Sequence, residues 1–64
     1  MSEIEAFKAT VETFIAKKGI KPTNFGKEYV GDPRFVFQLR EGREPRTRIR
    51  ERVLEAIKQA EAAQ

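Results

Sequence analysis

The sequence predicts an all-α fold, a compact bundle of four helices. Apolar residues recur every three or four positions along most of the chain, and proline and glycine stand where these runs begin and end. The 64 residues are enough for one domain, expected over 1–64, and the absence of cysteine leaves its core to helix packing alone. The expected helices cover 3–18, 22–30, 33–41 and 47–62.

The first helix is expected over 3–18, because its larger apolar residues are spaced to lie on one side. They are Ile4, Phe7, Val11, Phe14 and Ile15. Ser2 is the expected N-cap, and Gly19 fits the position after the helix end. The second helix, over 22–30, begins at Pro22, with Thr23 or Asn24 as alternative caps, and ends before Gly31. Two turns do not persist in isolation, so this helix must pack against others.

The third helix is expected over 33–41, with Asp32 as N-cap and Pro33 at the first helical position. Its inward stripe consists of Phe35, Val36 and Leu39, and Gly42 ends it. The fourth helix, over 47–62, has Thr47 as its expected N-cap and frays from about residue 60. Its apolar residues are Ile49, Val53, Leu54 and Ile57.

Charge is distributed unevenly along the chain, although the net charge is only +3. Residues 1–16 carry a balance of −2, residues 17–52 a balance of +6, and residues 53–64 a balance of −1. All the arginines lie between Arg34 and Arg52. A basic middle of this kind indicates one face that meets a polyanion, although a solvated charged surface would look the same.

Two short helices joined by a glycine turn and flanked by longer helices form the layout of a helix-turn-helix. The stretch from Pro22 to Glu41 resembles the motif of the lambda-repressor-like (Cro and repressor type) family, and a looser resemblance spans Lys18 to Ile57. The apolar positions and the small position of that motif all match. They are Phe25, Gly26, Tyr29, Val36 and Leu39. The family's turn glycine falls on Val30 here, with Gly31 one residue later, so a tighter turn is expected.

The resemblance implies that the third helix enters the major groove of double-stranded DNA. The family's DNA-facing positions map onto Asp32, Pro33, Arg34, Phe37, Gln38 and Glu41. The helical spacing independently places Arg34, Phe37, Gln38 and Glu41 away from the core, and these four are the expected base-reading residues. Arg34 suits guanine, Gln38 suits adenine and Phe37 suits a thymine methyl group. The alternatives are a phosphate contact for Arg34, a solvated Gln38 and a core position for Phe37.

Contacts to phosphates are expected from the basic and polar residues around the motif. They are Lys21, Thr23, Asn24, Lys27, Arg40, Arg43, Arg46 and Arg48. Each of them could equally be a solubilising surface residue. The whole pattern favours sequence-specific DNA binding by a transcriptional regulator of bacterial or phage type.

An enzyme is not expected, because the chain has no histidine and no cysteine and its one serine is Ser2. No catalytic residue, metal site, cofactor or small-molecule substrate is predicted. No apolar run approaches the roughly 20 residues that cross a bilayer, and the N-terminus does not resemble a secretory signal, so no membrane partner and a cytoplasmic location are expected.

The alternative function is a helical protein-interaction adaptor or anti-repressor that keeps this fold without binding DNA. Phe37 would then be an anchor for a protein partner. A DNA-binding module of this size reads few bases, so a homodimer on half-sites about 10 base pairs apart is possible, as is a second protein such as RNA polymerase.

Overall fold

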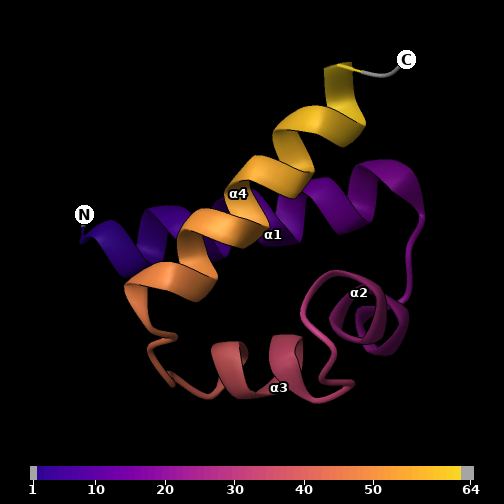
Figure 1. The fold of residues 1–64 in the computed structure, drawn as a ribbon. Helices are drawn as coiled ribbons and strands as arrows, with labels where there is room; N and C mark the ends of the chain where they lie inside the picture. The colour runs from indigo at the N-terminus through magenta and orange to yellow at the C-terminus, as the bar shows by residue number, and fades with distance from the viewer. Residues whose placement is uncertain (1, 63–64) are drawn as a thin grey trace.

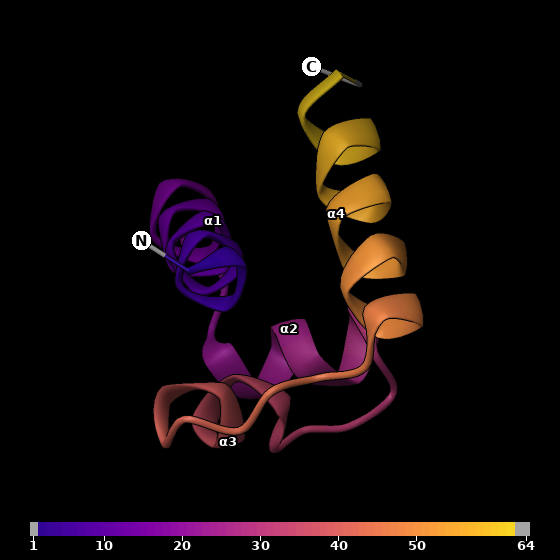
Figure 2. The same ribbon diagram turned by 90° about the vertical axis from the view of Figure 1, so that its left-hand side faces the viewer.

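The computed structural model describes residues 2–62, and this part of the chain is all-helical (Figure 1). Its four helices are α1 (Glu3–Lys18), α2 (Pro22–Tyr29), α3 (Phe35–Arg40) and α4 (Thr47–Ala62). The two long helices, α1 and α4, cross on one side of the molecule, and the two short helices lie together on the other (Figures 1 and 2). The prediction of a four-helix all-α fold is confirmed.

The core lies between these two layers and takes residues from every helix. Its buried members are Phe7, Val11, Phe14 and Ile15 of α1, Phe25 of α2, Phe35, Val36 and Leu39 of α3, and Val53 and Ile57 of α4. Although α3 has only six residues, half of them are buried in this core. A helix this short is stable only through such packing.

Aromatic side chains fill the part of the core that surrounds α2. The Phe25 ring stacks on the Tyr29 ring with centroids 4.6 Å apart. The Phe14 ring makes an edge-to-face contact with each of these two rings. The Phe35 ring lies 6.5 Å from the Phe25 ring and 6.4 Å from the Phe7 ring. These offset and edge-to-face contacts join α1, α2 and α3 into one unit.

The ends of α1 agree with the sequence, whereas the start of α2 does not. The Ser2 hydroxyl accepts a hydrogen bond from the Glu5 N–H, and Gly19 adopts a left-handed conformation with φ of 67°. In α2 the N-cap position is Lys21, and no side chain caps the helix. The prediction that Thr23 or Asn24 caps α2 is therefore wrong, because Pro22 brings both residues inside the first turn.

The turn between α2 and α3 is built on Gly26. Its carbonyl accepts hydrogen bonds from the N–H groups of Val30, Gly31 and Asp32. A Cβ atom at Gly26 would overlap the Asp32 carbonyl, so only glycine allows the turn to fold back onto α2. Gly31, the glycine of this turn, has φ of 83°.

The regular part of α3 is shorter than expected, Phe35–Arg40 in place of 33–41. The predictions of Asp32 as N-cap and Pro33 as the first helical residue are wrong, because the N-cap position is Arg34 and no side chain caps the helix. The Asp32 carboxylate instead accepts a hydrogen bond from the Arg34 N–H at 2.9 Å, within the turn that precedes the helix. The Phe35 N–H donates to the Asp32 carbonyl, which makes Pro33 and Arg34 a turn rather than helix. Helix α2 likewise ends at Tyr29 rather than at residue 30, so five residues separate the helices, and the expected tighter turn is not found.

Helix α4 differs from the sequence prediction at its start. Thr47 is its first helical residue rather than its N-cap, and the Thr47 hydroxyl accepts from the Arg50 guanidinium at 3.3 Å. Of its apolar residues, Leu54 is 40% exposed. The helix extends to Ala62, and residues 63–64 of the tail that is expected to fray lie outside the described residues.

Among residues 2–62, no helix combines the length and the apolar character that crossing a membrane requires.

Candidate nucleic-acid interface

Helix α3 has a buried face and an outward face. Phe35, Val36 and Leu39 are turned into the core. The four residues expected to read bases lie elsewhere: Arg34 precedes the helix, Phe37 and Glu41 are exposed, and Gln38 is half-buried. The predicted inward residues are confirmed, as is the exposure of Arg34, Phe37 and Glu41, whereas Gln38, which was expected to face outward, is half-buried.

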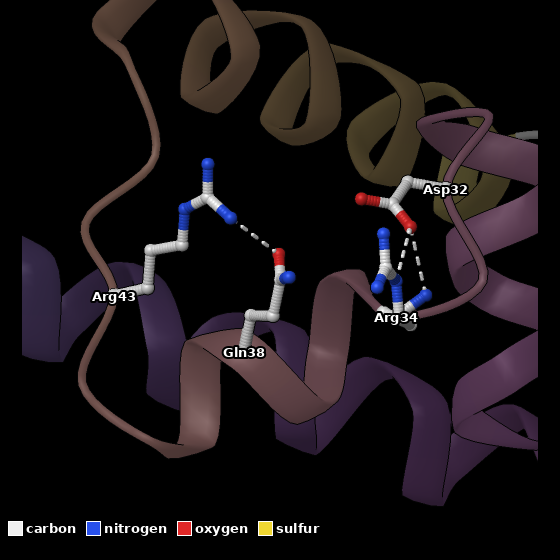
Figure 3. A network of polar contacts seen from close by, with 4 residues as sticks. All are labelled: Asp32, Arg34, Gln38 and Arg43. Carbon is white, nitrogen blue, oxygen red and sulfur yellow. Dashed lines mark hydrogen bonds and ion pairs between the residues drawn. The ribbon is translucent and has the colours of Figure 1, made fainter.

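Arg34 is positioned by the turn that precedes α3. The Asp32 carboxylate accepts from the Arg34 N–H and lies 3.9 Å from the Arg34 Nε atom (Figure 3). The Arg34 side chain remains 77% exposed, so the ion pair leaves most of the guanidinium accessible. A weak, solvated pair of this kind contributes little stability and orients the side chain only loosely.

Phe37 is an exposed aromatic residue on this surface. Its side chain is 44% exposed, so the alternative that it belongs to the core is wrong. The Arg40 guanidinium carbon lies 5.8 Å from the centre of the Phe37 ring, within the range of a cation–π contact. One side of the ring is therefore supported by Arg40.

Gln38 and Arg43 are joined by a side-chain hydrogen bond. The Arg43 Nη1 atom donates to the Gln38 Oε1 atom at 2.9 Å (Figure 3). The Arg43 backbone N–H also donates to the Gln38 carbonyl at 3.0 Å, and Gly42 between them has φ of 101°. The chain therefore folds back at the end of α3 and carries Arg43 over Gln38.

Arg40 is not a free cation, although the sequence grouped it with the phosphate-binding residues. Its Nε and Nη2 atoms donate to the two carboxylate oxygens of Glu12 in α1, at 2.7 and 2.8 Å. The hydrogen bond from Arg40 lowers the pKa of Glu12, and the same bond raises the pKa of Arg40. Arg40 thus links α3 to α1. Its guanidinium would have to share its donors between Glu12 and a phosphate.

The other residues expected at phosphates are all exposed and lie on elements that flank α3. Lys21 is the N-cap residue of α2, and Thr23, Asn24 and Lys27 lie within α2; Arg43, Arg46 and Arg48 lie on the 41–46 connection and the first turn of α4. Within residues 2–62, the ion pairs are Arg34–Asp32, Arg40–Glu12 and Arg50–Glu3. The lysines of α2 and the arginines at 43, 46 and 48 therefore have no acidic partner in this part of the chain.

Two features of this surface were not expected from the sequence. Glu12 lies 28 positions from Arg40, and no local spacing rule connects residues so far apart. A pocket of about 340 Å³ also borders the surface. Its lining includes Val30, Asp32, Phe35, Gln38, Leu39, Arg43, Glu44, Pro45, Arg46 and Ile49. One sign of this pocket is present in the sequence. Pro45 ends the helical pattern after α3, and the non-helical segment around it lines the pocket.

Comparison of the chain with protein-family models, with curated proteins and with solved structures finds no match. The function therefore has to be inferred from the geometry and charge of the described residues.

Proposed function

We propose that the chain is a sequence-specific double-stranded DNA-binding module, used as a transcriptional regulator of bacterial or phage type in the cytoplasm. Helix α3 enters the major groove, and α2 braces it against the sugar-phosphate backbone. The major groove is about 12 Å wide and admits one α-helix.

The observation that carries the proposal is the division of α3 into two faces. Val36 is fully buried, whereas Phe37 beside it is 44% exposed. Three core residues hold a helix of six residues in place, so its outward side chains start from a fixed backbone. A reading helix needs such support, because base contacts depend on side chains whose origin does not move.

The charges around α3 support the same proposal. Lys21 and Lys27, at the start of α2 and within it, and Arg46 and Arg48, before and within the first turn of α4, are all exposed. Exposed cations on the elements that precede and follow α3 in the chain can contact the phosphates that border a groove. Glu41, at the end of α3, can accept a hydrogen bond from the cytosine N4 amino group.

The first experiment measures binding of a dye-labelled random-sequence duplex by anisotropy over a series of salt concentrations. With four to six phosphates neutralised, log affinity is expected to fall with log salt at a slope of roughly −4 to −5. Affinity that does not change with salt would contradict DNA binding.

A second experiment locates the binding surface by NMR titration with the same duplex at two salt concentrations. Amide shifts are expected to gather between Lys21 and Arg48. The exposed residues Glu5 and Ala9, in the N-terminal half of α1, are the internal control, because this part of the chain carries few cations and lies in the other layer of the fold. Shifts centred on α1 would contradict the proposed interface.

A protein-interaction adaptor or anti-repressor is the second candidate function. Two exposed apolar side chains favour it, Phe37 and Leu54, because exposed aromatic and aliphatic residues serve as anchors in protein interfaces. Heparin competition separates the two functions. A bound duplex is displaced by this polyanion, whereas a complex held by Phe37 and Leu54 is not.

A further inference from the structure

Gln38 and Arg43 are held together by two contacts rather than by one. The side-chain contact joins Arg43 Nη1 to Gln38 Oε1 at 2.9 Å, and the backbone contact joins the Arg43 N–H to the Gln38 carbonyl at 3.0 Å. Gly42, with its positive φ of 101°, allows this reversal of the chain. The backbone therefore brings the two residues close together.

The contact also fixes which way the Gln38 amide points. A guanidinium group has only donors, so the atom that meets Arg43 has to be the amide oxygen. The Nε2 group of Gln38, with its two hydrogens, is left for other partners. Gln38 is half-buried and lines, together with Arg43, the pocket that borders this surface.

A free glutamine and this paired glutamine suit different bases. A free glutamine reads adenine by accepting from N6 and donating to N7. In Gln38 the oxygen that would accept is already bonded to Arg43, so the pair presents donors from the amide and from the remaining guanidinium N–H groups. Guanine is the base that offers two acceptors, O6 and N7, in the major groove.

We infer that Gln38 and Arg43 act as one donor unit that reads guanine. This inference rests on the proposed DNA binding, and it names the base at one position of the site. It also gives Arg43 a role in specificity, whereas the sequence alone assigned this residue to a phosphate and assigned Gln38 to adenine.

The test begins with selection of duplexes from a random pool by the whole chain and by Gln38→Ala. The base pair at which Gln38→Ala loses its preference is the one that Gln38 contacts. At this position the unmodified chain is expected to bind guanine more tightly than adenine, on the order of ten-fold or more. Replacing that guanine by 7-deazaguanine, which lacks the N7 acceptor, is expected to remove most of the advantage.

The deciding variant is Arg43→Ala, which releases the Gln38 oxygen. Its affinity ratio of guanine to adenine is expected to fall at least ten-fold, to one or below, because Gln38 can then pair with adenine. Arg46→Ala is the matched control, an exposed arginine of the same connection, and it should weaken both duplexes equally. Helical circular dichroism of each variant confirms that it is folded.

Three results would overturn the inference. In the first, Arg43→Ala lowers both affinities and keeps the ratio of guanine to adenine, as a phosphate contact would. In the second, the unmodified chain selects adenine at the Gln38 position. In the third, no duplex binds in a salt-sensitive manner, which would overturn the proposed function together with the inference. The first two leave DNA binding itself intact, so the two failures are distinguishable.

Discussion

Gly26 of α2 lies directly against the backbone carbonyl of Asp32, across the turn that leads into α3. This close approach joins the two short helices through backbone atoms, which cannot move aside as a flexible side chain can. The carbonyl of Gly26 in turn accepts three N–H groups of the turn. The position of α3, and with it the outward face, thus depends on a residue without a side chain.

Gly26→Ala is therefore expected to destabilise the fold by at least about 1–3 kcal/mol, the usual range for forced overpacking. The free energy of unfolding in urea, followed by circular dichroism, measures the loss. Asn24→Ala is the matched control on the same helix: its side chain is exposed and forms no cap, so a change within about 0.5 kcal/mol is expected. Equal stability of the two variants would contradict the described turn.

The Glu12–Arg40 pair predicts a pH-dependent contribution to stability. Because Arg40 lowers the pKa of Glu12 below the ordinary value of 4.5, the folded state binds the Glu12 proton less readily than the unfolded state. The contribution is present in full above that ordinary value and is lost as the pH falls through the lower folded-state pKa. Both side chains are about one-third to two-fifths exposed, so the pair is expected to contribute no more than about 1 kcal/mol.

A double-mutant cycle with Glu12→Gln and Arg40→Gln measures this coupling. We expect it to be favourable at pH 7 and close to zero at a pH where Glu12 is protonated. A coupling that persists in strong acid would show that the ion pair is not its source.

Arg34→Ala and Arg48→Ala should affect DNA binding differently. Loss of Arg34 is expected to cost about 1–3 kcal/mol on the selected site and to relax the preference at one base pair. Loss of Arg48, a predicted phosphate contact, should weaken all duplexes alike and reduce the salt slope by about 0.9. Selection from a random pool and salt titration of both variants measure the two effects, and identical profiles would refute the separate roles.

Phe37→Ala is expected to cost less stability than the roughly 3–5 kcal/mol of truncating a fully buried phenylalanine, because the residue is 44% exposed. Its main effect is expected in DNA binding, where we propose that the ring contacts a thymine methyl group. Replacing that thymine by uracil removes one methyl and should cost the unmodified chain about 0.8 kcal/mol. The Phe37→Ala variant should not distinguish the two duplexes, and a difference that survives the substitution would place the ring elsewhere.

The periodicity of the sequence predicts the two faces of α3, because a buried stripe and an exposed stripe have to alternate at helical spacing. Gly26 was likewise predictable as the small residue of the turn. The start of α3 was not predictable. Asp32 was expected as its N-cap, but the N-cap position is Arg34, and the Asp32 carboxylate accepts the Arg34 N–H in the turn before the helix. Residue type favours the cap but does not determine how many residues pass before regular helix begins.

The contacts between side chains of different helices could not be predicted from the sequence either. Arg40 looked like any other arginine of the basic middle, and only the packing of α3 against α1 brings it to Glu12. Leu54 is one of the apolar residues of α4, yet it is 40% exposed, whereas Val53 and Ile57 are buried. Such outcomes depend on how whole helices meet, which a spacing rule does not describe.

The stacking of Tyr29 on Phe25 has a practical consequence. The chain contains one tyrosine and no tryptophan, so its intrinsic emission above the phenylalanine band comes from a single known place in the aromatic cluster. Burial and the charge of Glu28 raise the pKa of Tyr29 above 10.0, so the phenol stays neutral from acid to mildly alkaline buffers. The fluorescence of Tyr29 can therefore report on the packing between α1 and α2 without an introduced dye.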